Sequence, residues 1–203
     1  MDTYSMYANT KKRQAQATRM KLESIGRRLF AERGFAGVSA EELVAAAKVT
    51  RGALYHHYDG KDGLFATIVE NVMKEVHAKL AKRATKQSDP LRALRLGIEE
   101  FLKICTQPSI QRILLVDAPT VLGWQKWREM DAHYGMGLLK SALSVAMRAK
   151  QIRNQDVDVL AHLLLGAMTE AAMVIARSSK QAAARNAAKR ALASIVDGWR
   201  ASD

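Results

Sequence analysis

Residues 39–58, which read SAEELVAAAKVTRGALYHHY, carry the signals of two short helices joined by a tight connection. Ser39 and, three residues later, Glu42 form a capping box, in which each side chain bonds the backbone N–H of the other residue and a helix begins. Thr50 then supplies the hydroxyl cap of a second short helix over residues 51–57. Two short helices separated by a three-residue connection are typical of a helix-turn-helix.

A longer helix is expected upstream of this pair, from about Ala15 to Arg33. Its apolar side chains recur at helical spacing, at Leu22, Ile25 and Leu29. Gly34 follows at the position where a helix is commonly ended by a glycine. The N-terminal region therefore predicts three helices, the last two forming the helix-turn-helix.

The net charge of +12 on 203 residues is unevenly distributed. Residues 8–33 contain eight basic and two acidic residues, and Asp62 onward adds another +7 that has no assigned function. Such an excess suits a polyanionic partner, either nucleic acid or an anionic membrane, unless it serves only solubility. Cations next to a helix-turn-helix favour contacts with phosphates. The basic residues of this stretch are Lys11, Lys12, Arg13, Arg19, Lys21, Arg27, Arg28 and Arg33.

Cysteine content and hydropathy bear on the compartment. The single cysteine, Cys105, excludes a disulfide framework and fits a reducing cytoplasm. The first nine residues contain no apolar stretch, so no secretory signal is expected. The apolar run Val159–Ala176 reaches the threshold length of a membrane span, but Glu170 near its middle would be costly there. We interpret this run as a helix buried on most sides by protein, with no membrane partner.

The rest of the chain predicts helices separated by short loops, so the fold class is all-α with about nine helices. The first three form a helix-turn-helix domain over residues 1–61, and a long fourth helix joins it to a helical domain over residues 62–203. Asp89 and Pro90 mark one helix start, with Asp as the cap and Pro at the first helical position. The helices expected after the helix-turn-helix span residues 61–84, 90–105, 110–116, 121–150, 155–177 and 181–200.

Two segments, FAERGFAGVS at 30–39 and VTRGALYHHYDGKDGLF at 49–65, resemble the TetR family of transcriptional regulators. The resemblance covers about residues 15–70, and beyond Lys74 it extends only to the general helical plan. The chain departs from the family at Gly60, where the family often has a polar helix cap, although glycine also caps acceptably. The resemblance implies a DNA-binding N-terminal domain and a ligand-binding and dimerisation domain after it.

The second short helix would present its N-terminal residues to base edges in the major groove. Arg51 can make a bidentate contact to guanine, while Gly52 and Ala53 are small enough for the backbone to approach the bases. Tyr55 can donate its hydroxyl to a phosphate, and Lys61 adds a cation at a helix N-terminus. The predicted DNA-binding residues are Ser39, Thr50, Arg51, Gly52, Ala53, Tyr55, His56 and Lys61.

Several nearby residues have a structural alternative. Ser39 and Thr50 can act as helix caps only, and His56 points differently from the histidine that follows it, so at most one of the two meets a phosphate. Leu54 and Tyr58 are expected in the core. For Arg51, Tyr55 and Lys61 the DNA contact is the preferred interpretation.

The resemblance also implies that the last two helices pair with those of a second subunit, and that a cavity among the fourth to eighth helices holds a small molecule. The eighth predicted helix, with apolar residues around most of its circumference, is compatible with that pairing. His162 and Glu170 lie on roughly one face of it. Hydrogen bonds at the interface are the preferred interpretation of this pair, and the alternative is that one of the two orients a polar group of the ligand. Aromatic and methionine side chains suit an apolar ligand. The tentative ligand-binding residues are Trp124, Trp127, Met130, His133 and Tyr134.

No catalytic signature is present in the sequence: the nucleophile elbow, the zinc-protease motif and the phosphate- and dinucleotide-binding loops are all missing. We therefore expect no enzyme, no cofactor and no metal site. The predicted function is a dimeric, ligand-responsive transcriptional regulator, a repressor by default, that binds a pseudo-palindromic operator and is released by an apolar or aromatic effector. The alternatives are a membrane-surface or general polyanion-binding helical protein, and a small-molecule carrier whose helix-turn-helix no longer works.

Overall fold

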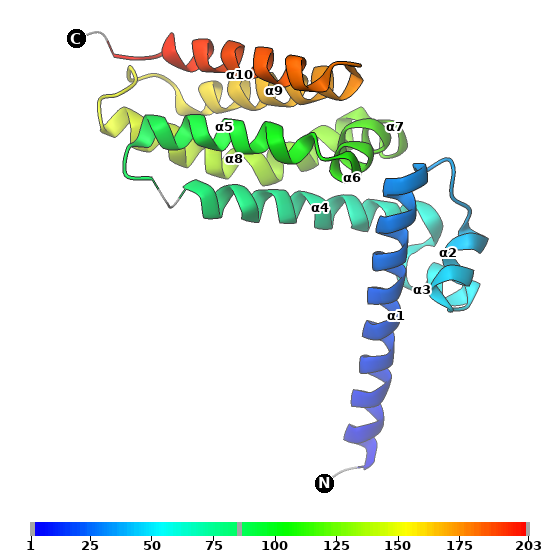
Figure 1. Cartoon of the computed structure of the whole chain (residues 1–203). Helices are drawn as coiled ribbons and strands as arrows, with labels where there is room; N and C mark the ends of the chain where they lie inside the picture. Colours follow the sequence, from blue (N-terminus) through cyan, green and yellow to red (C-terminus); the bar gives the residue numbers. More distant parts are fainter. Residues whose placement is uncertain (1–2, 85–86, 202–203) are drawn as a thin grey trace. The chain divides into compact units, whose positions relative to one another are not determined.

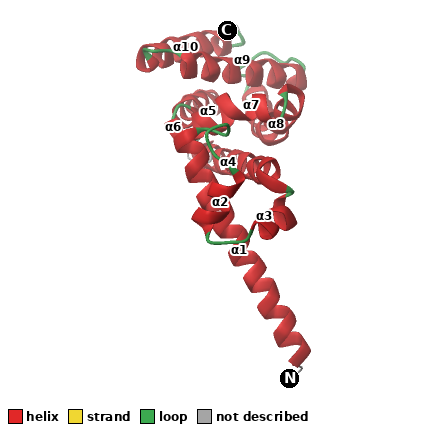
Figure 2. Ribbon diagram, turned by 90° about the vertical axis from the view of Figure 1, so that its right-hand side faces the viewer, coloured by secondary structure: helices red, strands yellow, loops and turns green. Residues whose placement is uncertain are grey.

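A computed structural model describes residues 3–84 and 87–201 (Figure 1). The chain divides into two compact units, residues 1–71 and 72–203. The division lies about ten residues beyond the boundary expected after Lys61. Within the described residues, the elements are helices joined by loops, apart from one isolated β-bridge between Ile152 and Arg200 (Figure 2).

The N-terminal unit contains α1 (Thr3–Arg33), α2 (Ala40–Ala47), α3 (Arg51–Tyr58) and the first part of α4 (Gly60–Ala84). The expected start of the first helix at Ala15 is wrong, because α1 begins about twelve residues earlier. No proline or glycine occurs between Thr3 and Ala15, so nothing in that stretch stops the helix.

Three phenylalanines form the centre of the N-terminal unit. Phe30 of α1, Phe35 of the following loop and Phe65 of α4 lie with ring centroids 5.0–5.7 Å apart. Leu54 and Tyr58 of α3 are buried beneath the helix-turn-helix, as predicted. The Tyr58 hydroxyl bonds the Glu23 carboxylate of α1 at 2.6 Å. These contacts hold α3 on α1 by its buried face and leave its other face outward.

Two glycines of α4 are required by the backbone. Gly60 has a φ of +91°, a conformation that L side chains rarely adopt, which accounts for glycine where a polar cap was expected. At Gly63 a Cβ atom would lie 1.5 Å from the carbonyl oxygen of Tyr58. The close approach of α4 to the end of α3 therefore depends on the absence of a side chain at residue 63.

The C-terminal unit contains the rest of α4, α5 (Pro90–Cys105), α6 (Pro108–Gln111), the π-helix η1 (Arg112–Asp117), α7 (Ala118–Val121), α8 (Trp124–Arg148), α9 (Val157–Arg177) and α10 (Gln181–Asp197). Asp89 caps α5 by accepting the Arg92 N–H at 3.0 Å, with Pro90 at the first helical position, as predicted. The consecutive elements α6, η1 and α7 replace the single short segment expected at 110–116. Counted as one segment, they bring the described helices to the expected nine.

The apolar helix α9 is long and apolar enough to cross a membrane by length and composition alone. Half of its most apolar stretch is buried inside the C-terminal unit, where α9 packs against α8 and α10. Burial of half of the stretch is less than the burial on most sides that the sequence predicted. The other half of the stretch is exposed on one face of the C-terminal unit.

Candidate nucleic-acid interface and ligand cavity

The helix-turn-helix is closed at both helix starts by side-chain caps. Ser39 Oγ accepts the N–H of Glu42 at 3.1 Å, and the Glu42 carboxylate accepts the N–H of Ser39 at 2.9 Å, which completes the predicted capping box. Thr50 Oγ1 accepts the N–H of Ala53 at 3.2 Å. Both hydroxyls therefore act as caps, and their predicted contacts with phosphate stay predictions.

The exposed face of α3 consists of four residues that the sequence assigned to DNA contact. Arg51, Gly52, Tyr55 and His56 are exposed, while Ala53 is half-buried between them. This face combines one guanidinium, one phenol and one imidazole with the backbone at Gly52, which no side chain of its own covers. The structure thus gathers five of the eight predicted DNA-binding residues on the solvent side of one short helix.

Arg51 has an acidic partner that the sequence analysis missed. Its guanidinium lies 3.1 Å from Glu41 Oε1 of α2, and the two side chains are 65% and 66% exposed. The guanidinium also lies over the Tyr55 ring, 5.5 Å from the centroid. An ion pair this exposed to solvent is weak, so Arg51 can exchange Glu41 for a base at small cost.

Gly52 has no structural need to be glycine in the free protein. A Cβ atom built there would meet only Thr50 Oγ1, at 3.9 Å, and its backbone φ is not positive. The missing side chain therefore leaves open space in front of α3, which is what a close approach of the helix to another molecule needs.

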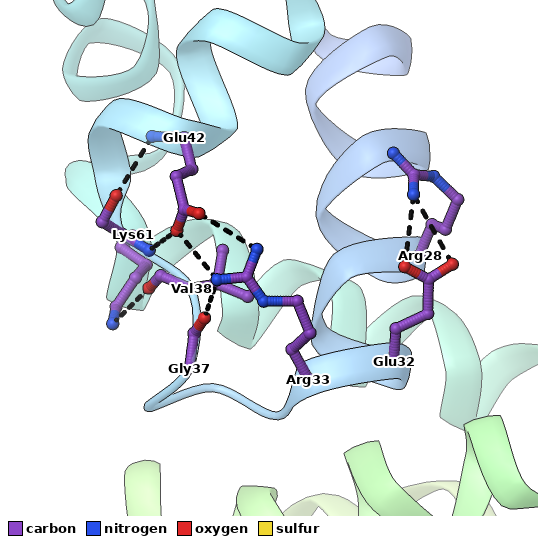
Figure 3. A network of polar contacts seen from close by, with 8 residues as sticks. Arg28, Glu32, Arg33, Gly37, Val38, Glu42 and Lys61 are labelled. Atoms are coloured by element: carbon purple, nitrogen blue, oxygen red, sulfur yellow. Dashed lines mark hydrogen bonds and ion pairs between the residues drawn. The ribbon is translucent and has the colours of Figure 1, made fainter.

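Lys61 is held by the protein itself. Its ammonium donates to the carbonyl oxygens of Phe35 and Val38, at 3.2 and 3.0 Å, and lies 3.9 Å from the Phe35 ring centroid. Figure 3 shows the bond to Val38 beside the α2 cap. At most one of its three N–H donors is left for a phosphate, so Lys61 mainly ties the α1–α2 loop to α4. Its predicted phosphate contact is not tested by this geometry.

Among the basic residues of 8–33, Arg28 and Arg33 are paired with carboxylates of the same unit. Arg28 bonds Glu32 at 3.2 Å, and Arg33 bonds Glu42 at 3.0 Å while also donating to the Gly37 carbonyl (Figure 3). The Ser39 N–H and Arg33 together lower the pKa of Glu42. Lys11, Lys12 and Arg13 are instead exposed on α1, so the N-terminal turns of α1 form a positively charged helical surface.

The C-terminal unit contains a cavity of about 130 Å³ bounded by α4, α5, η1, α8 and α9. Its lining is mostly apolar, with a few polar side chains: His77 of α4, Asp131 and Tyr134 of α8, and Thr169 of α9. Cys105 also lines it, and burial raises the pKa of this thiol well above its usual range. A buried thiol of this kind stays protonated and acts as an apolar group.

Two of the five tentative ligand residues, Trp127 and Tyr134, line this cavity. The other three, Trp124, Met130 and His133, are not among its lining residues, and their contact with a ligand stays a prediction. The cavity-lining residues of α8 repeat at helical spacing from Trp127, and positions 130 and 133 fall on other faces of that helix. Trp124 lies at the helix start and is 56% exposed.

Asp131 is a polar residue of the cavity lining that was not predicted from the sequence. It lies four residues after Trp127, hence on the same face of α8, and this spacing was the available signal. Its Oδ2 accepts from Arg128 at 2.8 Å and from Thr169 at 3.0 Å, joining α8 to α9. Burial raises the pKa of its carboxyl, and the bonds from Thr169 and Arg128 oppose this.

The outward face of α9 carries large apolar side chains without cover in the C-terminal unit. Val159, Leu163 and Val174 are 54%, 60% and 52% exposed, and Ile195 of α10 is 41% exposed. On α9 these residues follow helical spacing and form one stripe. Gly166 lies on the same side of α9, where the helix carries no side chain.

Comparisons with known proteins agree with this architecture. A family described as "Tetracyclin repressor-like, C-terminal domain" matches residues 91–199, and "Bacterial regulatory proteins, tetR family" matches residues 24–68. The chain is 26% identical to the transposon Tn10 TetC protein of Escherichia coli over 151 residues, which are 74% of this chain and 76% of that protein.

Solved structures show the same fold. A TetR-family regulator from Pectobacterium atrosepticum is 31% identical, with a TM-score of 0.85 over 93% of this chain and 97% of its own. RolR in complex with resorcinol is 17% identical, with a TM-score of 0.70 over 95% and 98% of the two chains, a likeness of fold alone. A helix-turn-helix with an outward α3, family matches over both units and a regulator at this identity lead to one conclusion: the chain belongs to the TetR family of transcriptional regulators and is not an enzyme.

Proposed function

We propose that this protein is a homodimeric, effector-responsive repressor, acting in the cytoplasm, that binds a pseudo-palindromic operator through the major groove. The observation that carries the proposal is the outward face of α3, where Arg51, Gly52, Tyr55 and His56 stand exposed on a helix fixed by its cap and its buried face. A rigidly held helix end with exposed hydrogen-bonding side chains suits base readout.

On this face each residue has a distinct role. Arg51 leaves Glu41 and forms the bidentate contact with guanine, while Gly52 lets the helix backbone come close to the bases. Tyr55 and His56 bind phosphates on either side of that contact. The exposed cations Lys11, Lys12 and Arg13 of α1 add charge that steers the protein to DNA without reading its sequence.

The dimer forms through α9 and α10. The exposed stripe of Val159, Leu163 and Val174 supplies the apolar core of an interface, and Ile195 of α10 extends it. Pairing two copies of this stripe about a two-fold axis brings two α3 helices to one duplex, which makes the operator pseudo-palindromic.

The effector binds in the cavity of the C-terminal unit and releases the operator. The apolar lining with few polar groups suits a small organic molecule. RolR, which shares the fold, has been solved with resorcinol, and this supports a small-molecule effector for this chain as well. A ligand of this kind acts by binding the released conformation better than the DNA-bound one.

Selection of bound duplexes from a random pool with the purified protein tests the proposal. We expect enrichment of one pseudo-palindromic sequence with two equal half-sites, since two α3 helices read it. Enrichment of a single asymmetric site would contradict the dimer. Recovery of unenriched duplexes, together with flotation on anionic vesicles, would replace the proposal by general polyanion binding.

A further inference from the structure

The few polar groups of the ligand cavity decide what can bind there, because the remaining lining is apolar. Asp131 is one of them, and its side chain is 16% exposed. Its hydrogen bonds from Arg128 and Thr169 both end on Oδ2, and neither uses Oδ1. Oδ1 of this buried carboxyl can therefore accept a hydrogen bond from a donor group on a ligand.

Trp127 provides a hydrogen-bond donor, whereas Asp131 provides an acceptor. Its side chain is 2% exposed and lines the cavity, and its buried indole N–H has no hydrogen-bond acceptor among the residues that the structure describes. Buried N–H groups are rarely left in this condition in folded proteins. An acceptor atom on a ligand would give the indole N–H of Trp127 the hydrogen bond that it lacks.

Trp127 and Asp131 lie four residues apart on α8, so their side chains leave the same face on adjacent turns. A hydroxyl is both a donor and an acceptor. One hydroxyl placed between the two turns can therefore donate to Asp131 and accept from Trp127 at once.

Charge excludes ionised ligands. Arg128 already balances the Asp131 carboxylate at 2.8 Å, and no lysine or arginine is among the described residues that line the cavity. An organic anion would meet the carboxylate, and the imidazole of His77 is the one basic side chain among the described lining residues that faces it. An organic cation would bring a second positive charge beside Arg128, and both would lose their hydration.

The volume of the cavity limits the size of the ligand. The cavity volume of about 130 Å³ is close to that of a protein cavity of about 150 Å³ known to hold benzene. Phe101, Trp127 and Tyr134 line the cavity and offer ring faces and edges to an aromatic ligand.

We propose that the effector is an uncharged molecule of about one aromatic ring, a phenol in its simplest form, whose hydroxyl donates to Asp131 and accepts from Trp127. This inference rests on the proposed function in one respect, that the cavity is the effector site. Binding of the phenol itself needs no operator.

Calorimetric titration of the full-length protein without DNA tests it, with phenol, toluene, benzoate and benzylamine as probes of similar size. Phenol should bind about tenfold more tightly than toluene, because toluene satisfies neither polar group. Benzoate and benzylamine should bind more weakly than phenol. Tighter binding of either ion, equal binding of toluene, or no binding of phenol would overturn the proposal.

Matched tryptophan variants locate the contact on α8. Trp127→Phe should weaken phenol about tenfold and change toluene by less than about twofold, since only the N–H is lost. Trp124→Phe, at the exposed start of the same helix, should change neither affinity.

Asp131→Asn should weaken the binding of phenol about fivefold, because a neutral acceptor is weaker than a carboxylate. An unchanged phenol affinity in both Trp127→Phe and Asp131→Asn would contradict the assigned contacts.

Operator release is measured separately. If phenol binds with this pattern but leaves the selected duplex bound, the proposed effector response fails and the inferred ligand chemistry stands. If an unrelated compound releases the duplex while phenol does not bind, the ligand chemistry fails and the proposed regulator stands.

Discussion

Gly52 lies in the first turn of α3 and Gly63 in the first turn of α4, and the two are glycine for different reasons. A Cβ atom at Gly63 would lie 1.5 Å from the Tyr58 carbonyl oxygen, whereas one at Gly52 would meet only Thr50 Oγ1 at 3.9 Å. The first glycine is required by the packing of α4, and the second leaves room in front of α3. The same substitution at the two sites therefore separates folding from binding.

Gly63→Ala should lower the free energy of unfolding by about 3 kcal/mol or more, because backbone atoms must move apart. Gly52→Ala should leave stability within about 0.5 kcal/mol and weaken operator binding. Urea unfolding followed by circular dichroism measures the free energy of unfolding of both variants, and a duplex titration measures the operator binding of Gly52→Ala. Equal stability of the two variants would show that the α3–α4 approach differs from the one described.

The Tyr58 hydroxyl predicts a stability change at high pH. Burial, and then the bond to Glu23, raise the pKa of this phenol from 10.0 to about 12. Between pH 10 and 12 the unfolded chain therefore loses this proton before the folded chain does, and the free energy of unfolding falls as the pH rises.

The stability advantage of the native protein over Tyr58→Phe should shrink by about 1 kcal/mol between pH 9 and pH 11. Urea unfolding at the two pH values measures it. Tyr55→Phe, at an exposed site on the same helix, is the control and should show no such trend. A difference between native and Tyr58→Phe protein that stays constant with pH would contradict the buried phenol.

Residues whose role depends on local chain geometry could be predicted from the sequence. The caps at Ser39 and Thr50 and the burial of Leu54 follow from spacing within one or two turns. Lys61 could not be predicted in this way, because its partner carbonyls lie 23 and 26 residues earlier in the chain. The spacing from Trp127 places Asp131 on the cavity face of α8, but its bond to Thr169 of α9 could not be predicted, because the two residues are 38 positions apart in the chain.

At the scale of elements, α1 and α9 differ most from their expected form or surroundings. The added N-terminal turns of α1, about 18 Å of helix, include Lys11, Lys12 and Arg13, which the sequence pattern placed before the first helix. Helix starts and ends marked by caps or proline, as at Asp89, were predicted well. The start of α1 has no such signal, and the sequence pattern alone could not locate it.

The exposed stripe of α9 predicts the oligomeric state. Leu163→Glu should convert a dimer into a folded monomer, because a charge at the interface core would be buried without a partner. Sedimentation velocity measures the mass, and circular dichroism checks the helices. Val145→Glu places the same charge on an exposed apolar position of α8 and should remain dimeric. A dimeric Leu163→Glu protein would move the interface away from α9.

At the scale of the whole molecule, the net charge of +12 divides into parts with different meaning. The share on α1 lies next to the exposed face of α3 in the chain and serves phosphate contacts in the proposed function. The +7 from Asp62 onward lies mostly on the unit with the cavity and the α9 stripe, and nothing in the structure explains it. The family was predicted from residues 30–39 and 49–65, and the all-α fold from the helical pattern along the whole chain, whereas the lining of the cavity required the tertiary structure.

The most direct test of base reading by α3 compares Arg51→Ala with Lys126→Ala, which removes the same charge from α8, on the selected duplex and on single-base variants of it. Arg51→Ala should cost about 1–3 kcal/mol of binding and abolish the preference at one guanine position of each half-site. Lys126→Ala should keep every base preference. If Arg51→Ala weakens all duplexes equally and keeps the guanine preference, then α3 does not read the operator as proposed.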